Sequence, residues 1–247
     1  MNFSFWSDDE SKKFTKGINL TDPNVYASIT KEELKAILKS DSDIDIPLLD
    51  DRLEVLQEAG KVLLKKYDGS FVNCVEKCEK SAQTLLKLVV NDFPSYCDTA
   101  EYNGKTVAFY KRAQILIADI WGCFEGQSYG EFYDIDSVTM FADYRIPQAL
   151  LYFDALEYSK ELKEYLESGK RLKTGDRYEV EIRGCSIWAT ELACEETKKL
   201  LQNDEDCKDK IMNSILIDHF LWDFRREQMD NDKMKAIPFH RIRCMYY

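Results

Sequence analysis

Two stretches organise this sequence: FYKRAQ at residues 109–114 and TMFADYRIPQ at residues 139–148. The first begins a pattern of apolar residues, three and four positions apart, that continues over residues 109–120. This spacing predicts an amphipathic helix with one face on a core. Lys111 lies off that face, so its amine is available for chemistry.

In the second stretch, Asp143 comes four residues before Pro147. Proline favours the first turn of a helix, because the N–H that it lacks has no partner there. We therefore expect Asp143 near a helix N-terminus, where free N–H groups and the helix dipole favour the charged carboxylate. An anion beside the cationic Lys111 suits a positively charged transition state, such as the oxocarbenium ion formed when a sugar–base bond breaks. Spacing alone also allows a plain N-cap and a solvated lysine.

Four runs carry a resemblance to a known family: FYKRAQIL (109–116), TMFADYR (139–145), EVEIRGCS (179–186) and PFHRIRC (238–244). They resemble the queuosine salvage protein family, the queuosine 5′-phosphate N-glycosylase/hydrolases, and the similarity covers nearly the whole chain. The resemblance implies release of the base queuine from its nucleotide, for reuse in tRNA modification. It also implies a mainly α fold similar to the helix-hairpin-helix DNA glycosylases, with at most a small β-hairpin.

The resemblance assigns roles to individual residues. Asp143 matches the catalytic aspartate of the family and Lys111 its neighbouring lysine. Queuine carries a positively charged secondary amine, and Asp218 and Asp223 are its expected partners. The rings of Phe141 and Trp222 are expected to stack on the base. Tyr144 and Arg183 are expected to contact the substrate. For the two rings, a plain core position is the alternative.

A helix expected over about residues 212–227 is apolar around most of its circumference, Phe220 included, so we expect it to be buried on several sides. Asp218 lies on a face of this helix without polar neighbours. A carboxylate taken out of water needs a cation or several donors, which makes Asp218 a site candidate. Asp223 lies roughly 140° further around the helix, so the two can share a ligand only at a helix edge.

Glu181, Arg183 and Gly184 lie together in another predicted helix. The two charged residues either form structural ion pairs with neighbouring elements or contact the substrate, and the sequence leaves both open. A glycine inside a helix costs about 1 kcal/mol relative to alanine. We therefore expect close approach of another helix, or access for a ligand, at Gly184.

The 247 residues, 45% of them hydrophobic, suffice for a core, and we expect one domain over residues 1–247. The formal net charge of −11 disfavours a polynucleotide partner, whereas a mononucleotide needs only one or two well-placed cations. Arg241 and Arg243 either contact the 5′-phosphate or pair with the acidic surface, and we favour the pairing. No apolar run reaches the roughly 20 residues of a membrane span. We expect an intracellular protein, in the cytoplasm or the nucleus.

Eight cysteines and two histidines raise the question of a metal. Cys74 and Cys78 are four residues apart, but no second close pair follows, and His219 and His240 are isolated in the sequence. We expect no metal site, no organic cofactor and free thiols in a reducing compartment.

Capping and turn signals place the remaining elements. Thr30 and Glu33 have the spacing of a capping box, and Asn103-Gly104 is typical of a tight hairpin turn. The predicted helices cover about residues 31–39, 47–68, 71–90, 147–157, 176–201 and 212–227.

The sequence departs from the family near its start. The segment over residues 7–27 is shorter than the family pattern, so we expect the N-terminal part of the family domain to be shortened or missing. Because a missing wall can open a site to water, two functions stay open: an active hydrolase, or a catalytically disabled helical binding protein for queuine or a related nucleotide.

Overall fold

The computed structural model describes residues 19–38, 44 and 46–247. The chain groups into two compact units, one of residues 1–97 and 119–133 (unit 1) and one of residues 98–118 and 134–247 (unit 2). The described residues are mainly helical and contain one two-stranded sheet, which confirms the predicted fold class. The single domain and the likeness to DNA glycosylases stay predictions. Most of the segment expected to be shortened lies outside the described residues.

In unit 1, α2 and α3 pack on the longer helix α4, and further short helices follow in the chain. Its elements are α2 (Pro23–Tyr26), α3 (Lys31–Ile37), α4 (Leu49–Lys66), α5 (Phe71–Glu76), α6 (Ala82–Asp92), η1 (Pro94–Tyr96) and η2 (Ser128–Gly130). The capping box is confirmed, since the Thr30 hydroxyl accepts from the Glu33 N–H and the Glu33 carboxylate from the Thr30 N–H. Gly60 lets α2 approach α4, because an added Cβ would lie 2.7 Å from the backbone nitrogen of Ala27.

The single helix predicted over residues 71–90 is wrong, since the structure has two helices there. Glu79 and Lys80 between them have positive φ angles of 50° and 63°. Ser81 then starts α6, where its hydroxyl accepts from the Thr84 N–H at 3.1 Å. The apolar spacing continues across this break and therefore hides it.

Unit 2 combines a hairpin with a group of packed helices. Its elements are β1 (Thr99–Tyr102), β2 (Lys105–Ala108), α7 (Lys111–Cys123, of which residues 119–123 belong to unit 1), η3 (Ile135–Ser137), α8 (Ile146–Tyr152), α9 (Lys160–Glu167), α10 (Arg177–Gln202), α11 (Ser214–Glu227), η4 (Gln228–Asp230) and α12 (Asp232–Ala236). The strands pair antiparallel, with Thr99 opposite Ala108, and Asn103 and Gly104 take the positive φ angles of the predicted turn.

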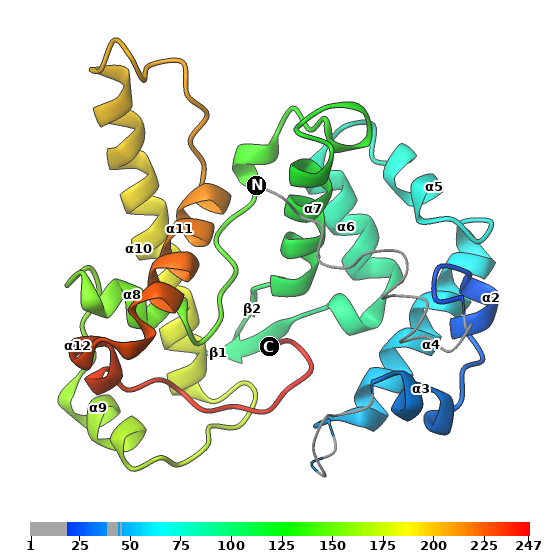
Figure 1. The fold of residues 1–247 in the computed structure, drawn as a ribbon, viewed down its shortest axis with the longest axis horizontal. Helices are drawn as coiled ribbons and strands as arrows, with labels where there is room; N and C mark the ends of the chain where they lie inside the picture. The colour runs from blue at the N-terminus through cyan, green and yellow to red at the C-terminus, as the bar shows by residue number, and fades with distance from the viewer. Residues whose placement is uncertain (1–18, 39–43, 45) are drawn as a thin grey trace. The chain divides into compact units, whose positions relative to one another are not determined.

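The core of unit 2 forms where α8, α10 and α11 pack together (Figure 1). Its buried members are Phe109, Met140, Ala142, Ile146, Ala149, Leu150, Val180 and Leu221. Residues from both organising stretches are therefore in this core, and burial of each of its larger side chains stabilises the fold by about 1.5–3 kcal/mol.

Three expectations about the helices of unit 2 are corrected. Phe220 is 59% exposed and stacks on Phe224 at the surface, so α11 is less enclosed than its composition indicates. The α8 helix ends at Tyr152, ahead of the positive φ angle of Asp154. The α9 and α12 helices escaped prediction, because at eight and five residues both are shorter than the window of 11–18 residues over which apolar periodicity is recognised. No helix in the described part of the chain is long and apolar enough to cross a membrane.

Candidate active site

The two organising stretches are joined by the buried amide of Gln114. Its Nε2 donates to the Phe109 carbonyl at 2.9 Å, and its Oε1 accepts from the Thr139 N–H at 2.8 Å. Because one side chain binds backbone groups of both stretches, the start of α7 and the segment leading to Asp143 keep a fixed register.

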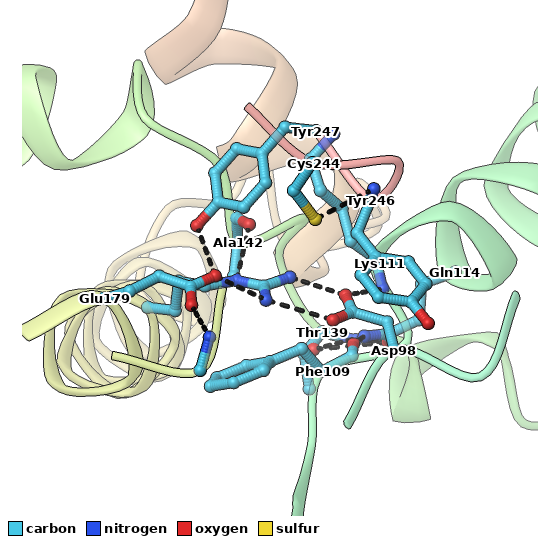
Figure 2. A network of polar contacts seen from close by, with 12 residues as sticks. Asp98, Phe109, Lys111, Gln114, Thr139, Ala142, Glu179, Cys244, Tyr246 and Tyr247 are labelled. Carbon is cyan, nitrogen blue, oxygen red and sulfur yellow. Dashed lines mark hydrogen bonds and ion pairs between the residues drawn. The ribbon is translucent and has the colours of Figure 1, made fainter. Parts of the chain in front are cut away.

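A second connection comes from Arg183 on α10, and Figure 2 labels its partners Asp98, Ala142 and Glu179. Its guanidinium donates to both carboxylate oxygens of Asp98, at 3.0 and 2.5 Å, and to the Ala142 carbonyl at 3.1 Å. Asp98 also accepts from the backbone N–H of Lys111, the first residue of α7, at 3.2 Å. The Asp98–Arg183 pair therefore ties the residue before Asp143 to the backbone of Lys111.

The network around Arg183 extends to Glu179 and the C-terminal residue. The guanidinium contacts Glu179 at 3.3 Å, and the Tyr247 hydroxyl donates to Glu179 at 3.0 Å (Figure 2). Burial lowers the pKa of Arg183, but the hydrogen bonds and charge of Asp98, with the charge of Glu179, outweigh it and leave this pKa raised. Because its nitrogens bind protein groups, the geometry favours the structural alternative for Arg183, and its contact with substrate stays a prediction.

Sequence reasoning missed Asp98 and Glu179. Asp98 follows Cys97 in a segment without apolar periodicity, and its partner Arg183 is 85 residues away in the chain. Glu179 lies one helical turn before Arg183, a spacing that allows an ion pair, but only the structure shows that both are buried. Glu181, by contrast, pairs with the exposed Arg177 and accepts from the Tyr102 hydroxyl.

Asp143 lies directly ahead of α8, as predicted. Its Oδ1 accepts from the backbone N–H groups of Arg145 and Ile146, at 2.7 and 2.9 Å. The residue is half-buried, and no group in the described part of the chain hydrogen-bonds its Oδ2. Burial raises the pKa of Asp143, and the N–H contacts and the charge of Lys111 only partly oppose this. The predicted effect of the helix N-terminus is therefore present but outweighed.

Lys111 supplies a positive charge near this carboxylate. Burial lowers the pKa of its amine, and the negative charges of Asp143 and Asp218 oppose that shift. Among the described residues, however, no carboxylate oxygen lies within 4.0 Å of the Lys111 Nζ, so the amine forms no direct ion pair. The ammonium group thus lies near the carboxyl groups of Asp143 and Asp218 while remaining open to a ligand.

Asp218 on α11 is 5% exposed, and its Oδ2 accepts from the Phe141 N–H at 2.8 Å. Burial raises the pKa of Asp218 to about 8, and the charge of Asp143 adds to the shift. The Phe141 N–H and the charge of Lys111 lower it, but by less. Burial therefore favours the protonated form of Asp218 at neutral pH.

The other predicted substrate contacts are more scattered. Phe141 is buried, with its ring edge against His219, and Trp222 is half-buried beside the core with Arg226 over its ring. Tyr144 is half-buried, and Asp223 is exposed on a different face of α11 from Asp218. The structure thus brings Lys111, Asp143 and Asp218 together, and the roles of the remaining residues stay predictions.

The structure also bears on Gly184 and on possible metal ligands. An added Cβ at Gly184 would meet nothing within 4 Å, so close helix approach does not explain this glycine. Within residues 19–38, 44 and 46–247, no group of three or more histidine, cysteine, aspartate or glutamate side chains is arranged to hold a metal ion.

Comparison with known proteins gives a consistent picture. The family model described as "Queuosine salvage protein" matches residues 11–247. Relatives from Bos taurus and Mus musculus are each 46% identical over 270 aligned residues, which cover 100% of this chain and 79% of the relative. A relative from Schizosaccharomyces pombe is 38% identical, with 100% of this chain and 80% of the relative covered. All three carry the name "Queuosine 5′-phosphate N-glycosylase/hydrolase". The chain therefore belongs to the queuosine salvage protein family.

Proposed function

We propose that this protein hydrolyses the N-glycosidic bond of queuosine 5′-phosphate. Water adds across the bond between ribose C1′ and the base nitrogen, and the products are ribose 5-phosphate and queuine. The electron pair of the broken bond leaves with the base, which takes up a proton. The family and the names of the relatives support this activity. The observation that carries it is a half-buried Asp143 with one unoccupied oxygen in the field of Lys111.

Asp143 stabilises or captures the ribosyl cation. The two backbone N–H groups on Oδ1 fix the orientation of the carboxylate before substrate binds. Oδ2, which no described group occupies, faces the carbon where positive charge develops. Partial burial strengthens this attraction, because the effective dielectric constant is lower than in water.

Lys111 keeps Asp143 ionised and orients either Asp143 or the substrate. Burial alone favours the neutral carboxyl, and the ammonium charge opposes this by lowering the pKa of Asp143. Because no described carboxylate pairs directly with Nζ, the amine has hydrogen-bond donors left for the substrate. Arg183 and Asp98 position both segments and need no contact with the substrate for that role.

Asp218 receives the amine of queuine. In the unliganded site its pKa is about 8, and a proton supplies the compensating positive charge. When the base binds, its ammonium group replaces the proton as the compensating positive charge, so the carboxyl loses its proton. Phe141 and Trp222 stack on the base, Tyr144 adds a further contact, and Asp223 can reach the ligand only at the edge of α11. A small nucleotide, rather than a polynucleotide, suits the net charge of −11. We place the activity in the cytoplasm or the nucleus.

The test is incubation with queuosine 5′-phosphate, followed by chromatography for free queuine and for ribose 5-phosphate. The proposal expects both products in equal amounts. Binding of the nucleotide without release of either product would favour the disabled binding protein instead. The 46% identical relative from Bos taurus serves as the positive control, since release of products by that protein alone would favour the disabled binding protein.

A further inference from the structure

Unit 2 contains a cavity of about 570 Å³ that has an unusual density of positive charge. Five arginines line it: Arg145, Arg171, Arg225, Arg241 and Arg243. They come from the start of α8, the loop after α9, the end of α11 and the C-terminal segment. In a protein with a formal net charge of −11, five arginines around one cavity are not expected from the overall composition.

These arginines are not explained by ion pairs. Among the residues that the structure describes, no carboxylate lies within 4.0 Å of any of the five guanidinium groups. Instead, Arg225 donates to the Gln148 side chain at 3.0 Å, and Arg145 and Arg241 lie over the rings of Tyr144 and Phe239. The preference for pairing of Arg241 and Arg243 with the acidic surface is therefore wrong for the described residues.

Arg145 and Arg225 also repel each other. Both are half-buried, and burial, together with the charge of Arg145, lowers the pKa of the Arg225 guanidinium. Two like charges that are partly removed from water destabilise the empty protein. An anion between them would relieve this repulsion, and the planar fork of arginine matches the oxygen geometry of a phosphate group.

His240, on the wall of the cavity, has a buried ring nitrogen without a hydrogen-bond partner among the described residues. The residue is 1% exposed. The Tyr247 hydroxyl donates to Glu179, so His240 Nε2, at 3.0 Å from that hydroxyl, must carry the hydrogen. Nδ1 is then an acceptor, and it has no partner in the described part of the chain. Buried acceptors are normally satisfied, but this one has almost no exposed surface, so a ligand in the cavity could reach it only after a shift of its neighbours.

We propose that the arginine-lined cavity binds a phosphate monoester, with Arg145 and Arg225 holding the phosphate group and Arg241 and Arg243 closing over it. The phosphate can belong to the nucleotide substrate or to a separate phosphorylated molecule. The substrate source rests on the proposed function. It is favoured by the position of Arg145, whose backbone N–H binds Asp143, and by the effect of the Asp143 charge on Arg225.

The test measures binding apart from turnover. Inorganic phosphate and ribose 5-phosphate are titrated by calorimetry into the full chain and into two variants, R225Q and the double variant R241Q/R243Q. Arg241 and Arg243 are exposed, so the double variant should fold even if R225Q does not. The matched control is R177Q, which removes an exposed arginine of the same unit that is paired with Glu181. The proposal expects at least a tenfold weaker affinity in both cavity variants and no change in the control.

Kinetics then distinguish the two sources. If the cavity holds the substrate's own phosphate, R241Q/R243Q raises KM for queuosine 5′-phosphate at least tenfold and leaves KM for the nucleoside queuosine unchanged. If phosphate affinity falls while both KM values stay the same, the cavity serves a separate phosphorylated ligand. Absence of phosphate binding by the unaltered chain, or equal binding by all variants, would overturn the proposal. Neither of those results would affect the proposed hydrolysis at Asp143.

Discussion

Replacing Asp98 with asparagine should destabilise the protein far more than a typical single substitution. The side chain is 1% exposed and forms a two-pronged ion pair with Arg183, which is 2% exposed. Removal of one partner from a buried ion pair costs about 3–5 kcal/mol, because the other charge stays buried. Glu179 remains 3.3 Å from the guanidinium, and the amide oxygen keeps one hydrogen bond, so the lower end of that range applies.

Urea unfolding followed by circular dichroism measures this effect. With a slope of about 1–3 kcal/mol per molar urea, a loss of about 3 kcal/mol lowers the midpoint by about 1–3 M. Glu164→Gln is the matched control, since it removes a carboxylate from the exposed Lys160–Glu164 pair and should leave the midpoint unchanged. A midpoint for Asp98→Asn within error of the control would refute the reasoning that the buried pair holds the two segments together.

Four further substitutions test other parts of the structure. The pKa of Asp218 is about 8 in the folded protein, above its value of about 3.9 in unfolded chains. Between these two pH values the folded state binds more protons than the unfolded state, so the free energy of unfolding falls as the pH rises. Asp218→Asn should reduce this pH dependence, measured by urea unfolding at pH 5 and at pH 8. Lys111→Met should lower kcat by about 10²-fold or more. It should also shift the acidic limb of the pH–rate profile to higher pH, because the ammonium no longer lowers the pKa of Asp143; an unshifted limb would count against the coupling. Gly184→Ala should raise the free energy of unfolding by about 0.5–1 kcal/mol, since the added methyl group meets open space. Gly60→Ala should lower it by about 1–3 kcal/mol through its clash with the Ala27 backbone, and equal effects at the two glycines would contradict the packing described.

Local signals were enough to predict much of the fold. The capping box at Thr30, the Asn103-Gly104 turn and the position of Asp143 ahead of α8 depend on residues within a few positions of one another. Their physics is contained in a short window of sequence. The break before Ser81 is also local, but an uninterrupted apolar pattern hid it.

The buried polar contacts that position the candidate site could not be predicted in the same way. Asp98 and Arg183 are 85 residues apart, and Phe141 and Asp218 are 77 apart. No periodicity indicates which distant polar groups meet in a buried network. The pKa of Asp143 shows the same limit, because the helix N-terminus is visible in the sequence whereas the burial that outweighs it arises only from tertiary packing.

In the proposed hydrolysis, the Asp143 carboxylate stabilises positive charge on the ribose. The most direct measurement is single-turnover release of queuine from queuosine 5′-phosphate by Asp143→Asn and by the unaltered chain, with urea unfolding as the check on folding. Asparagine keeps an oxygen that can accept from the Arg145 and Ile146 N–H groups but lacks the negative charge. We expect a folded variant whose release rate falls by about 10³-fold or more. Release at the normal rate by a folded variant would contradict it.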